Sequence, residues 1–359
     1  MPISAIDSVN LALQHTKQRL LQPFRFWQWT RLAIVGLLAG EAGSSFNFHA
    51  PSNPNVPQGG APNIPFGHGW PNIDPMVLGS VLAVLVISGV VFAFVMLYIS
   101  SVMRFILFDS VLTRECHIRA GWTRRQGPGW NLFLWQIGYA VVAIVAVVVL
   151  LGFPALFAYS KGWFHPPADH VPQLVMTGIA VFLLFGIFAV VAAVVHVFTK
   201  DFVVPQMALE GIGPIEAWRR LLPQLQAEAG SYVVYAIMKV VLAIAFGILI
   251  GVVSFILGLL IAIPAVGVGL AAILAGKTAG LTWNVLTITA AIVAGCILLA
   301  FLFYVIALIG VPAIVFFPAY AMYFFAGRYP ALNLALYPVP EGAVSPPPPH
   351  LPPAPAPAG

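Results

Sequence analysis

Charged residues are scarce in this chain. Asp, Glu, Lys and Arg make up 8% of its 359 residues, whereas 60% are hydrophobic and the mean hydropathy is +0.96. A soluble domain is about half apolar and about a quarter charged, so a chain this apolar needs lipid around it. Its apolar runs extend from Leu32 to Phe325 and leave no room for a separate soluble domain. The sequence therefore predicts an all-α, polytopic transmembrane helix bundle.

The sequence also lacks the motifs that are typical of catalytic, metal-binding and disulfide sites. The two cysteines, Cys116 and Cys296, form no CxxC or Cys/His pattern, so neither a disulfide framework nor a zinc site is indicated. No GxSxG, Walker loop, HExxH or paired-carboxylate motif supplies a nucleophile or an acid/base pair. We therefore predict no catalytic, metal or cofactor residues and no cofactor. The spacing of four histidines matches no recognised ligand set: His49, His68, His165 and His170.

The first 23 residues predict an amphipathic helix. Ser4 and Asp7 have the spacing of a helix-start capping box, and apolar residues then recur at helical intervals up to Leu20. Lys17 and Arg19 suit the headgroup layer, so the helix is expected to lie in the membrane interface until Pro23 ends it.

Residues 24–336 are expected to form the transmembrane domain. Six spans are predicted, at 24–43, 76–103, 132–159, 171–198, 232–264 and 285–309. The helix of the second span should continue to Arg119, and a basic turn should occupy 121–129. A second interfacial helix should lie within 200–230, with an apolar face formed by Ile215, Trp218, Leu222 and Leu225. Pro264 should end the fifth span before a re-entrant piece at 265–276, and Pro312 and Pro318 should interrupt the final aromatic segment.

Two segments resemble neither spans nor interfacial helices. Residues 44–75 are rich in Pro, Gly and Asn, which is typical of an extracytoplasmic loop. Residues 337–359 are rich in proline and predict a disordered cytoplasmic tail.

The distribution of basic residues predicts the orientation. Six spans place every Lys and Arg except Lys161 and Lys277 on one side, which the positive-inside rule makes cytoplasmic. We expect a multi-pass protein of a bacterial inner membrane with both termini in the cytoplasm. The formal net charge of +5 then reflects this orientation and not a nucleic-acid partner.

A stripe of small residues on the fifth span predicts close helix packing, at Gly247, Gly251, Ser254 and Gly258. Small side chains let helix backbones approach where lipid gives no hydrophobic drive to associate. Packing within the bundle and a homodimer seam are the two alternatives.

Asp201 is the acid most deeply placed among apolar residues, after the fourth span. A carboxylate at such a depth is costly without a partner, and we predict an ion pair with Arg104 or Arg219. Lys200 and Lys239 are the other cations expected at this level. The alternative is a hydrated aspartate that contributes almost nothing to stability.

Short motifs suggest a family resemblance. The sequence reads FILFDSVL at 105–112, DFVVP at 201–205, AWRR at 217–220 and Gly-Arg-Tyr at 327–329. This layout resembles uncharacterised bacterial membrane proteins, which in turn look like the membrane domain that accompanies glycerophosphodiester phosphodiesterases. The chain has no room for the catalytic barrel of those enzymes, so the resemblance implies only a membrane-domain role.

Three functional hypotheses follow. The first is a non-enzymatic scaffold or accessory subunit that contacts the bilayer and binds a protein partner through its interfacial helices or proline-rich tail. The second is a small-molecule or lipid transporter, suggested by the expected broken helices. The third is a membrane domain linked to glycerophosphodiester or phospholipid metabolism, which depends on the resemblance alone.

Overall fold

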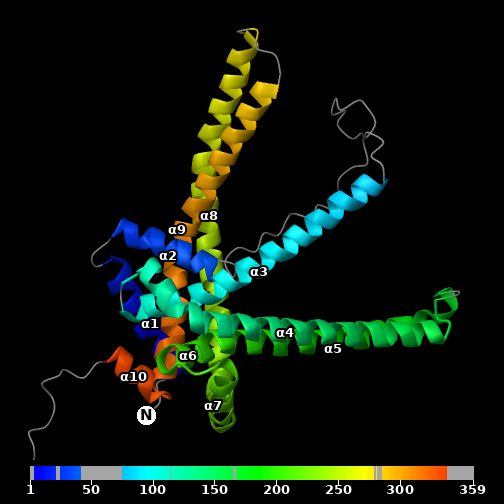
Figure 1. Cartoon of the computed structure of the whole chain (residues 1–359), viewed down its shortest axis with the longest axis vertical. Coiled ribbons are helices and arrows are strands. Elements are labelled where there is room, and N and C mark those ends of the chain that lie inside the picture. Colours follow the sequence, from blue (N-terminus) through cyan, green and yellow to red (C-terminus); the bar gives the residue numbers. More distant parts are fainter. Residues whose placement is uncertain are drawn as a thin grey trace, which may run out of the picture.

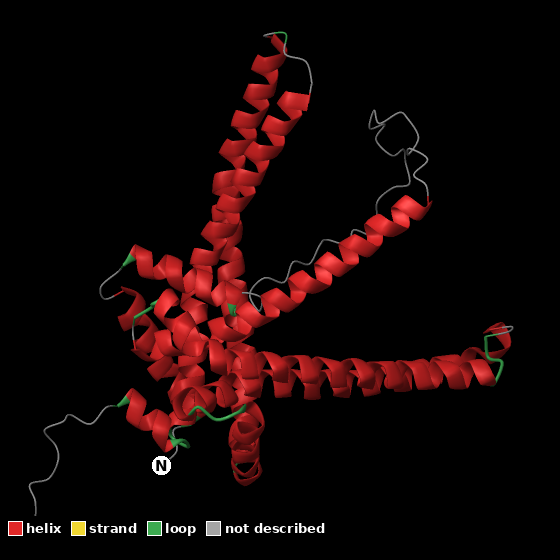
Figure 2. Cartoon of the chain, viewed as in Figure 1, coloured by secondary structure: helices red, strands yellow, loops and turns green. Residues whose placement is uncertain are grey.

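The computed structural model describes residues 4–21, 25–41, 75–113, 115–164, 167–278, 280 and 285–337. Within these ranges the chain is helical and contains no strand (Figure 2). A 3-10 turn, η2 (Pro167–His170), and a π-helical turn, η3 (Thr199–Val203), accompany ten α-helices: α1 (Ala5–Leu21), α2 (Phe26–Leu38), α3 (Pro75–Thr113), α4 (Ile118–Ser160), α5 (Val171–Phe198), α6 (Val204–Glu210), α7 (Pro214–Ala227), α8 (Ala229–Thr278), α9 (Val285–Ala326) and α10 (Pro330–Leu336). The predicted all-α membrane fold is confirmed.

The helices form a compact hub from which three arms diverge (Figure 1). The arms are α3 alone, the α4–α5 hairpin and the α8–α9 hairpin. The hub contains the short helices together with the inner ends of the long ones. Every long helix therefore contributes one end to the hub and extends the other end away from it.

Five helical segments are long and apolar enough to cross a membrane, one fewer than predicted. They cover 76–113, 118–160, 171–210, 229–276 and 286–326. The missing span is the one predicted at 24–43, where α2 has 13 residues. At 1.5 Å per residue this helix is about 20 Å long, which is too short for a hydrocarbon core of about 30 Å.

Prolines end fewer helices than expected. Helix α8 continues through Pro264, so the predicted re-entrant piece at 265–276 is wrong, and α9 continues through Pro312 and Pro318. A proline removes one backbone hydrogen bond, and membrane helices tolerate this loss where the remaining backbone bonds stay within the helix. The basic turn at 121–129 is also wrong, because those residues form the first part of α4. In contrast, α3 ends at Thr113 instead of continuing to Arg119.

The N-terminal helix forms as predicted, but it packs on protein. The Ser4 hydroxyl accepts the Asp7 backbone N–H at 3.1 Å, which is the N-cap bond of the predicted capping box, and it donates to the Asp7 carboxylate at 2.6 Å. Ala12 is buried against the hub, and His15 forms a 3.1 Å hydrogen bond with the Tyr323 hydroxyl of α9. The apolar face of α1 thus covers α9.

The second predicted interfacial helix is α7, which also continues through its internal Pro223. The residues that it buries are Ala217 and Leu221, whereas Ile215 and Leu222 of the predicted apolar face are exposed. Trp218 and Leu225 of that face are partly buried against the core, so the face by which α7 contacts the hub overlaps the predicted one only in part.

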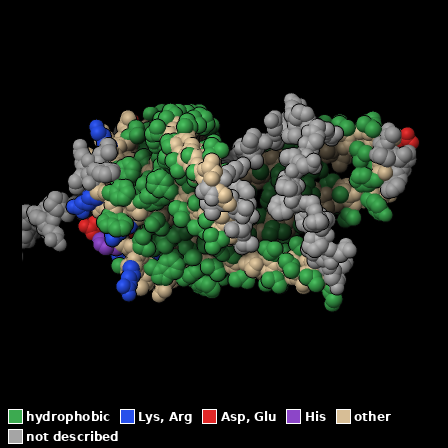
Figure 3. Space-filling model, turned by 90° about the horizontal axis from the view of Figure 1, so that it is seen from above, with side chains coloured by type: hydrophobic (Ala, Val, Ile, Leu, Met, Phe, Trp, Pro, Cys, Tyr) green, Lys and Arg blue, Asp and Glu red, His purple; other side chains and the backbone are tan. Residues whose placement is uncertain are grey.

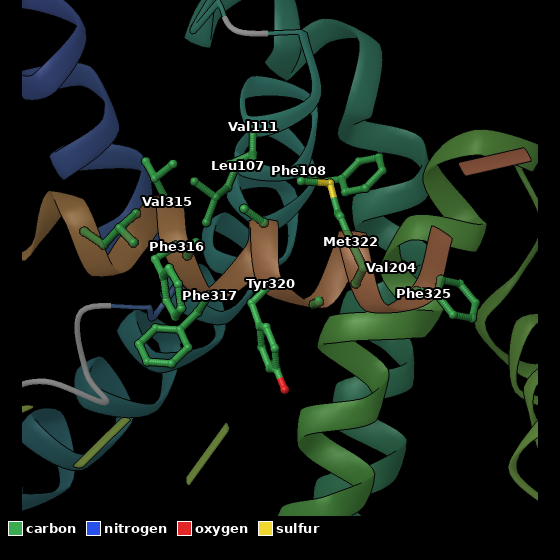
Figure 4. Packing of buried hydrophobic residues seen from close by; sticks show 14 of the residues in the cluster. Leu107, Phe108, Val111, Val204, Val315, Phe316, Phe317, Tyr320, Met322 and Phe325 are labelled. Carbon is green, nitrogen blue, oxygen red and sulfur yellow. The ribbon is translucent and has the colours of Figure 1, made fainter. Parts of the chain in front are cut away.

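The hydrophobic core lies in the hub and is centred on the last part of α9. In Figure 4, Val315, Phe316 and Met322 of α9 lie beside Leu107 and Phe108 of α3. Close packing at this point requires glycine: a methyl group on Gly36 of α2 would lie 2.3 Å from the Ile314 side chain. The hub is therefore packed like the interior of a folded protein.

Candidate functional site

A group of buried charged residues lies in the hub where the arms begin. We call Glu41, Arg104, Lys200, Asp201, Tyr235 and Lys239 the root cluster. Glu41 follows α2, Arg104 belongs to α3, Lys200 and Asp201 lie in η3, and the other two are on α8. The cluster thus joins four parts of the chain that are far apart in sequence.

The π-helical turn η3 explains how two adjacent residues, Lys200 and Asp201, bind different partners. Pro205 follows this turn and has no backbone N–H to bond the carbonyl of Asp201, four residues before it. A local widening of the helix accommodates that missing bond, and such π-bulges are frequent at functional sites. From this turn Lys200 pairs with Glu41, and Asp201 pairs with Lys239.

Asp201 is bound by two residues of α8. The Tyr235 hydroxyl donates to Asp201 Oδ2 at 2.8 Å, and Lys239 Nζ contacts the same oxygen. Tyr235 and Lys239 are four residues apart and so lie on one helix face. The Asp201 side chain is 3% exposed and the Lys239 side chain 14%, so this is a buried ion pair.

The predicted partners of Asp201 bind elsewhere, so the predicted pairing is wrong. Arg104 Nε donates to the Ala39 carbonyl at 3.2 Å. Arg219 lies on α7 with its side chain 76% exposed and 3.8 Å from Glu216. Lys239 takes their place because its helix packs directly beside η3 in the hub.

Glu41 forms the second ion pair of the cluster, with Lys200. Burial by itself would raise the pKa of Glu41, but the ammonium group of Lys200, with Lys239 and Arg104 nearby, outweighs burial and lowers that pKa below 4.5. No sequence pattern singled out Glu41. The available signal was its place immediately after a short apolar run, where an acid needs a cationic partner.

The root cluster borders a small cavity of about 30 Å³ between α3, η3 and α9. Glu41, Arg104, Lys200 and Asp201 supply its polar wall, and its remaining wall is apolar: Leu107, Phe108, Val204, Pro205, Pro318, Ala321 and Met322. A space of this size holds one or two water-sized groups. The cluster as a whole has three cations and two anions, an excess of one positive charge, whereas the charged residues that line the cavity are two cations and two anions.

The short motifs of the family resemblance converge on the hub. Asp109 of FILFDSVL receives two 2.6 Å hydrogen bonds from Arg125, whose third bond, at 2.8 Å, goes to the Ala208 carbonyl. Phe202 of DFVVP is fully buried and lies 5.2 Å, centroid to centroid, from the Tyr235 ring. These bonds and ring contacts join α3, α4, α6 and α8.

The other two motifs, AWRR and Gly-Arg-Tyr, also form hydrogen bonds and an ion pair with residues of the hub. Trp218 of AWRR donates to the Thr199 hydroxyl at 3.3 Å. In the Gly-Arg-Tyr motif, Arg328 forms a 2.8 Å ion pair with Glu228, and the Tyr329 hydroxyl donates to Glu210. Burial and this hydrogen bond raise the pKa of Tyr329. All four motifs therefore hold the hub together.

The glycines of the small-residue stripe are not in close contact with neighbouring atoms. A methyl group placed on Gly247, Gly251 or Gly258 would have no neighbouring atom within 4 Å among the described residues. Ser254 lies between them, partly buried, on the same arm. Gly247 and Gly258 are also partly buried, whereas Gly251 is exposed, so the structure shows no close approach of a neighbouring helix at these glycines, and their role in helix packing stays a prediction.

The part of the chain that the structure describes contains no group of three or more His, Cys, Asp or Glu residues suited to a metal ion. His49, His68 and His165 lie outside the described residues, as do almost all of the predicted loop at 44–75 and of the tail at 337–359.

One family model matches the chain, over residues 3–335, and its description is "Family of unknown function (DUF7544)". No curated protein and no solved structure shows significant similarity to the chain. Nothing in these comparisons links it to the membrane domains of glycerophosphodiester phosphodiesterases.

Proposed function

The chain belongs to DUF7544, a family of unknown function, and we propose that it is a non-enzymatic membrane scaffold or accessory subunit. Its hub holds three apolar arms apart, and the arms bind other components of the membrane. The proposal goes beyond the coarser finding that five apolar helices make this a membrane protein.

The exposure of the arms is the observation that carries this proposal. In the most apolar window of each spanning segment, the share of residues buried within the protein is 0% for three segments and 6% for the segments of α8 and α9. Helices of a self-contained bundle would bury one face against their neighbours. Lipids or helices of another protein must therefore cover these surfaces.

Charge supports an orientation with the hub on the cytoplasmic side. Figure 3 shows Lys and Arg side chains gathered at the end of the molecule that the hub occupies, with hydrophobic side chains over most of the visible remainder. By the positive-inside rule the hub faces the cytoplasm and the tips of the arms face the other side. We propose a bacterial inner membrane with both termini cytoplasmic.

Cysteine labelling tests this orientation. In a cysteine-free background, Lys161→Cys, at the tip of the α4–α5 arm, should react with an impermeant thiol reagent in intact cells. Arg219→Cys, on the exposed face of α7, should react only after the membrane is opened. The reverse pattern would show that the hub faces outward.

Photocrosslinking from the arms tests the scaffold role. We would place a photoreactive amino acid at Phe182 on α5 or Phe255 on α8, both highly exposed, and at the fully buried Phe324 as a control. An accessory subunit should give a defined adduct with one membrane protein from an arm and none from Phe324. Adducts with lipid alone from both arms would refute protein binding.

Neither alternative function gains support from the structure. The transporter hypothesis depended on broken helices near Pro264 and Pro312, and both helices are continuous. The link to phospholipid metabolism depended on a resemblance that the comparisons do not reproduce.

A further inference from the structure

We propose that the cavity of the root cluster binds the phosphate group of an anionic phospholipid through Arg104. This inference concerns a lipid site in the hub and does not depend on the scaffold role of the arms. It follows from the charge of the cluster, the donors of Arg104 that have no partner among the described residues, the size of the cavity and its place in the hub.

The first step is the charge balance. Glu41 is paired with Lys200, and Asp201 with Lys239. The guanidinium of Arg104 is left as the excess positive charge beside these two pairs. A buried or half-buried charge is costly unless an opposite charge or water approaches it. One monoanion in the cavity would balance the cluster.

The second step is the geometry of Arg104. Nε donates to the Ala39 carbonyl at 3.2 Å, and among the described residues the two terminal nitrogens have no hydrogen-bond partner. That bond leaves the outer N–H groups of Arg104 without a partner among the described residues, and Arg104 is one of the residues that line the cavity. A planar group with parallel donors matches the oxygens of a phosphate in a bidentate arrangement.

The third step is the size and lining of the cavity. About 30 Å³ has room for one or two water-sized groups, which suits two oxygens of a phosphate but not a complete solute. The rest of the ligand must lie outside the cavity, and the apolar wall formed by Leu107, Phe108 and Met322 suits the hydrocarbon part of a lipid. Free inorganic phosphate would make no use of that wall.

The fourth step is position. The cavity lies in the hub, lined by residues of α3, η3, α6 and the inner part of α9, and the arms extend away from this hub (Figure 1). If the arms cross the bilayer, this part of the hub lies at the level of the lipid headgroups. A phosphodiester of charge −1 then matches the excess of one cation, which favours phosphatidylglycerol over zwitterionic phosphatidylcholine.

The test uses the full chain in phosphatidylcholine nanodiscs, with phosphatidylglycerol added in increasing fraction. Bound lipid is counted by native mass spectrometry, and thermal unfolding is measured in parallel. The wild type should retain phosphatidylglycerol in preference to phosphatidylcholine and unfold at a higher temperature as its fraction rises. Arg104→Gln should weaken retention about tenfold or more, the factor expected for one charge-assisted hydrogen bond.

Arg219→Gln is the matched control, since it removes an equal charge from an exposed position on α7, and it should leave retention unchanged. If both variants lose lipid equally, the effect is general surface charge and the proposal fails. If inorganic phosphate stabilises the protein in phosphatidylcholine as well as phosphatidylglycerol does, the lipid assignment is overturned. Should Arg104→Gln not fold, equal retention of both lipids by the wild type would still refute the proposal.

Discussion

The buried pair of Asp201 and Lys239 should be among the strongest polar contacts in the hub. Replacing Lys239 with Met keeps an unbranched side chain that is one atom shorter and removes the charge. The Asp201 carboxylate, 3% exposed, would then keep only the 2.8 Å hydrogen bond from Tyr235. Leaving one charge of a buried pair without its partner costs about 3–5 kcal/mol, so we expect a loss of about 3 kcal/mol in the free energy of unfolding.

A double-mutant cycle separates this pair from general damage to the hub. Asp201→Asn and Lys239→Met should each destabilise, and the double variant should lose less than the sum by about 1–3 kcal/mol, as is typical of residues in contact. Unfolding would be followed in mild detergent. The exposed pair of Arg219 and Glu216, at 3.8 Å, is the control and should show coupling below about 1 kcal/mol.

The same cycle with Arg104 decides between the observed and the predicted pairing. Arg104→Gln combined with Asp201→Asn should show weaker coupling, because Arg104 donates to the Ala39 carbonyl and not to Asp201. Coupling that is larger for Arg104 than for Lys239 would refute the reasoning from the structure.

Three further predictions concern packing, pH and the tail. Gly36→Ala should lower the thermal stability of the hub, because the new methyl group would lie 2.3 Å from Ile314 and overpacking costs about 1–3 kcal/mol. Gly251→Ala, whose methyl group would have no atom within 4 Å among the described residues, should be neutral or slightly stabilising in the same thermal unfolding assay. Because the pKa of Glu41 is lowered in the folded protein, its carboxylate contributes to stability fully above pH 4.5, and this contribution should be lost as the pH falls through the pKa of the folded state. Glu41→Gln should abolish that part of the pH dependence of stability, and an unchanged pH profile would contradict the prediction. Truncation after Pro340 should leave membrane insertion and thermal stability intact, since a proline-rich segment has few apolar groups to bury, and a marked loss of stability would show that the tail packs on the helices.

The sequence by itself determined the class of the fold and most of the long helices. Apolar runs longer than the bilayer is thick can only be helical in lipid, because each backbone polar group must be bonded within its own segment. For this reason the prediction of a span at 171–198 coincides with α5 (Val171–Phe198) and that at 285–309 lies within α9. The capping box at Ser4 was also predictable, because it depends on residues three positions apart.

The tertiary structure decided which helix faces are packed and which partners the charged residues bind. The sequence shows that Asp201 needs a cation but not which one, since Arg104, Lys200 and Lys239 all lie at the same level of their helices. Only the packing of α8 beside η3 selects Lys239. Likewise a stripe of glycines permits close packing without requiring it, and the divergence of the arms leaves Gly251 uncovered. Local pattern fixes a helix because its hydrogen bonds are local, whereas ion pairs and helix contacts depend on segments that only the folded hub brings together.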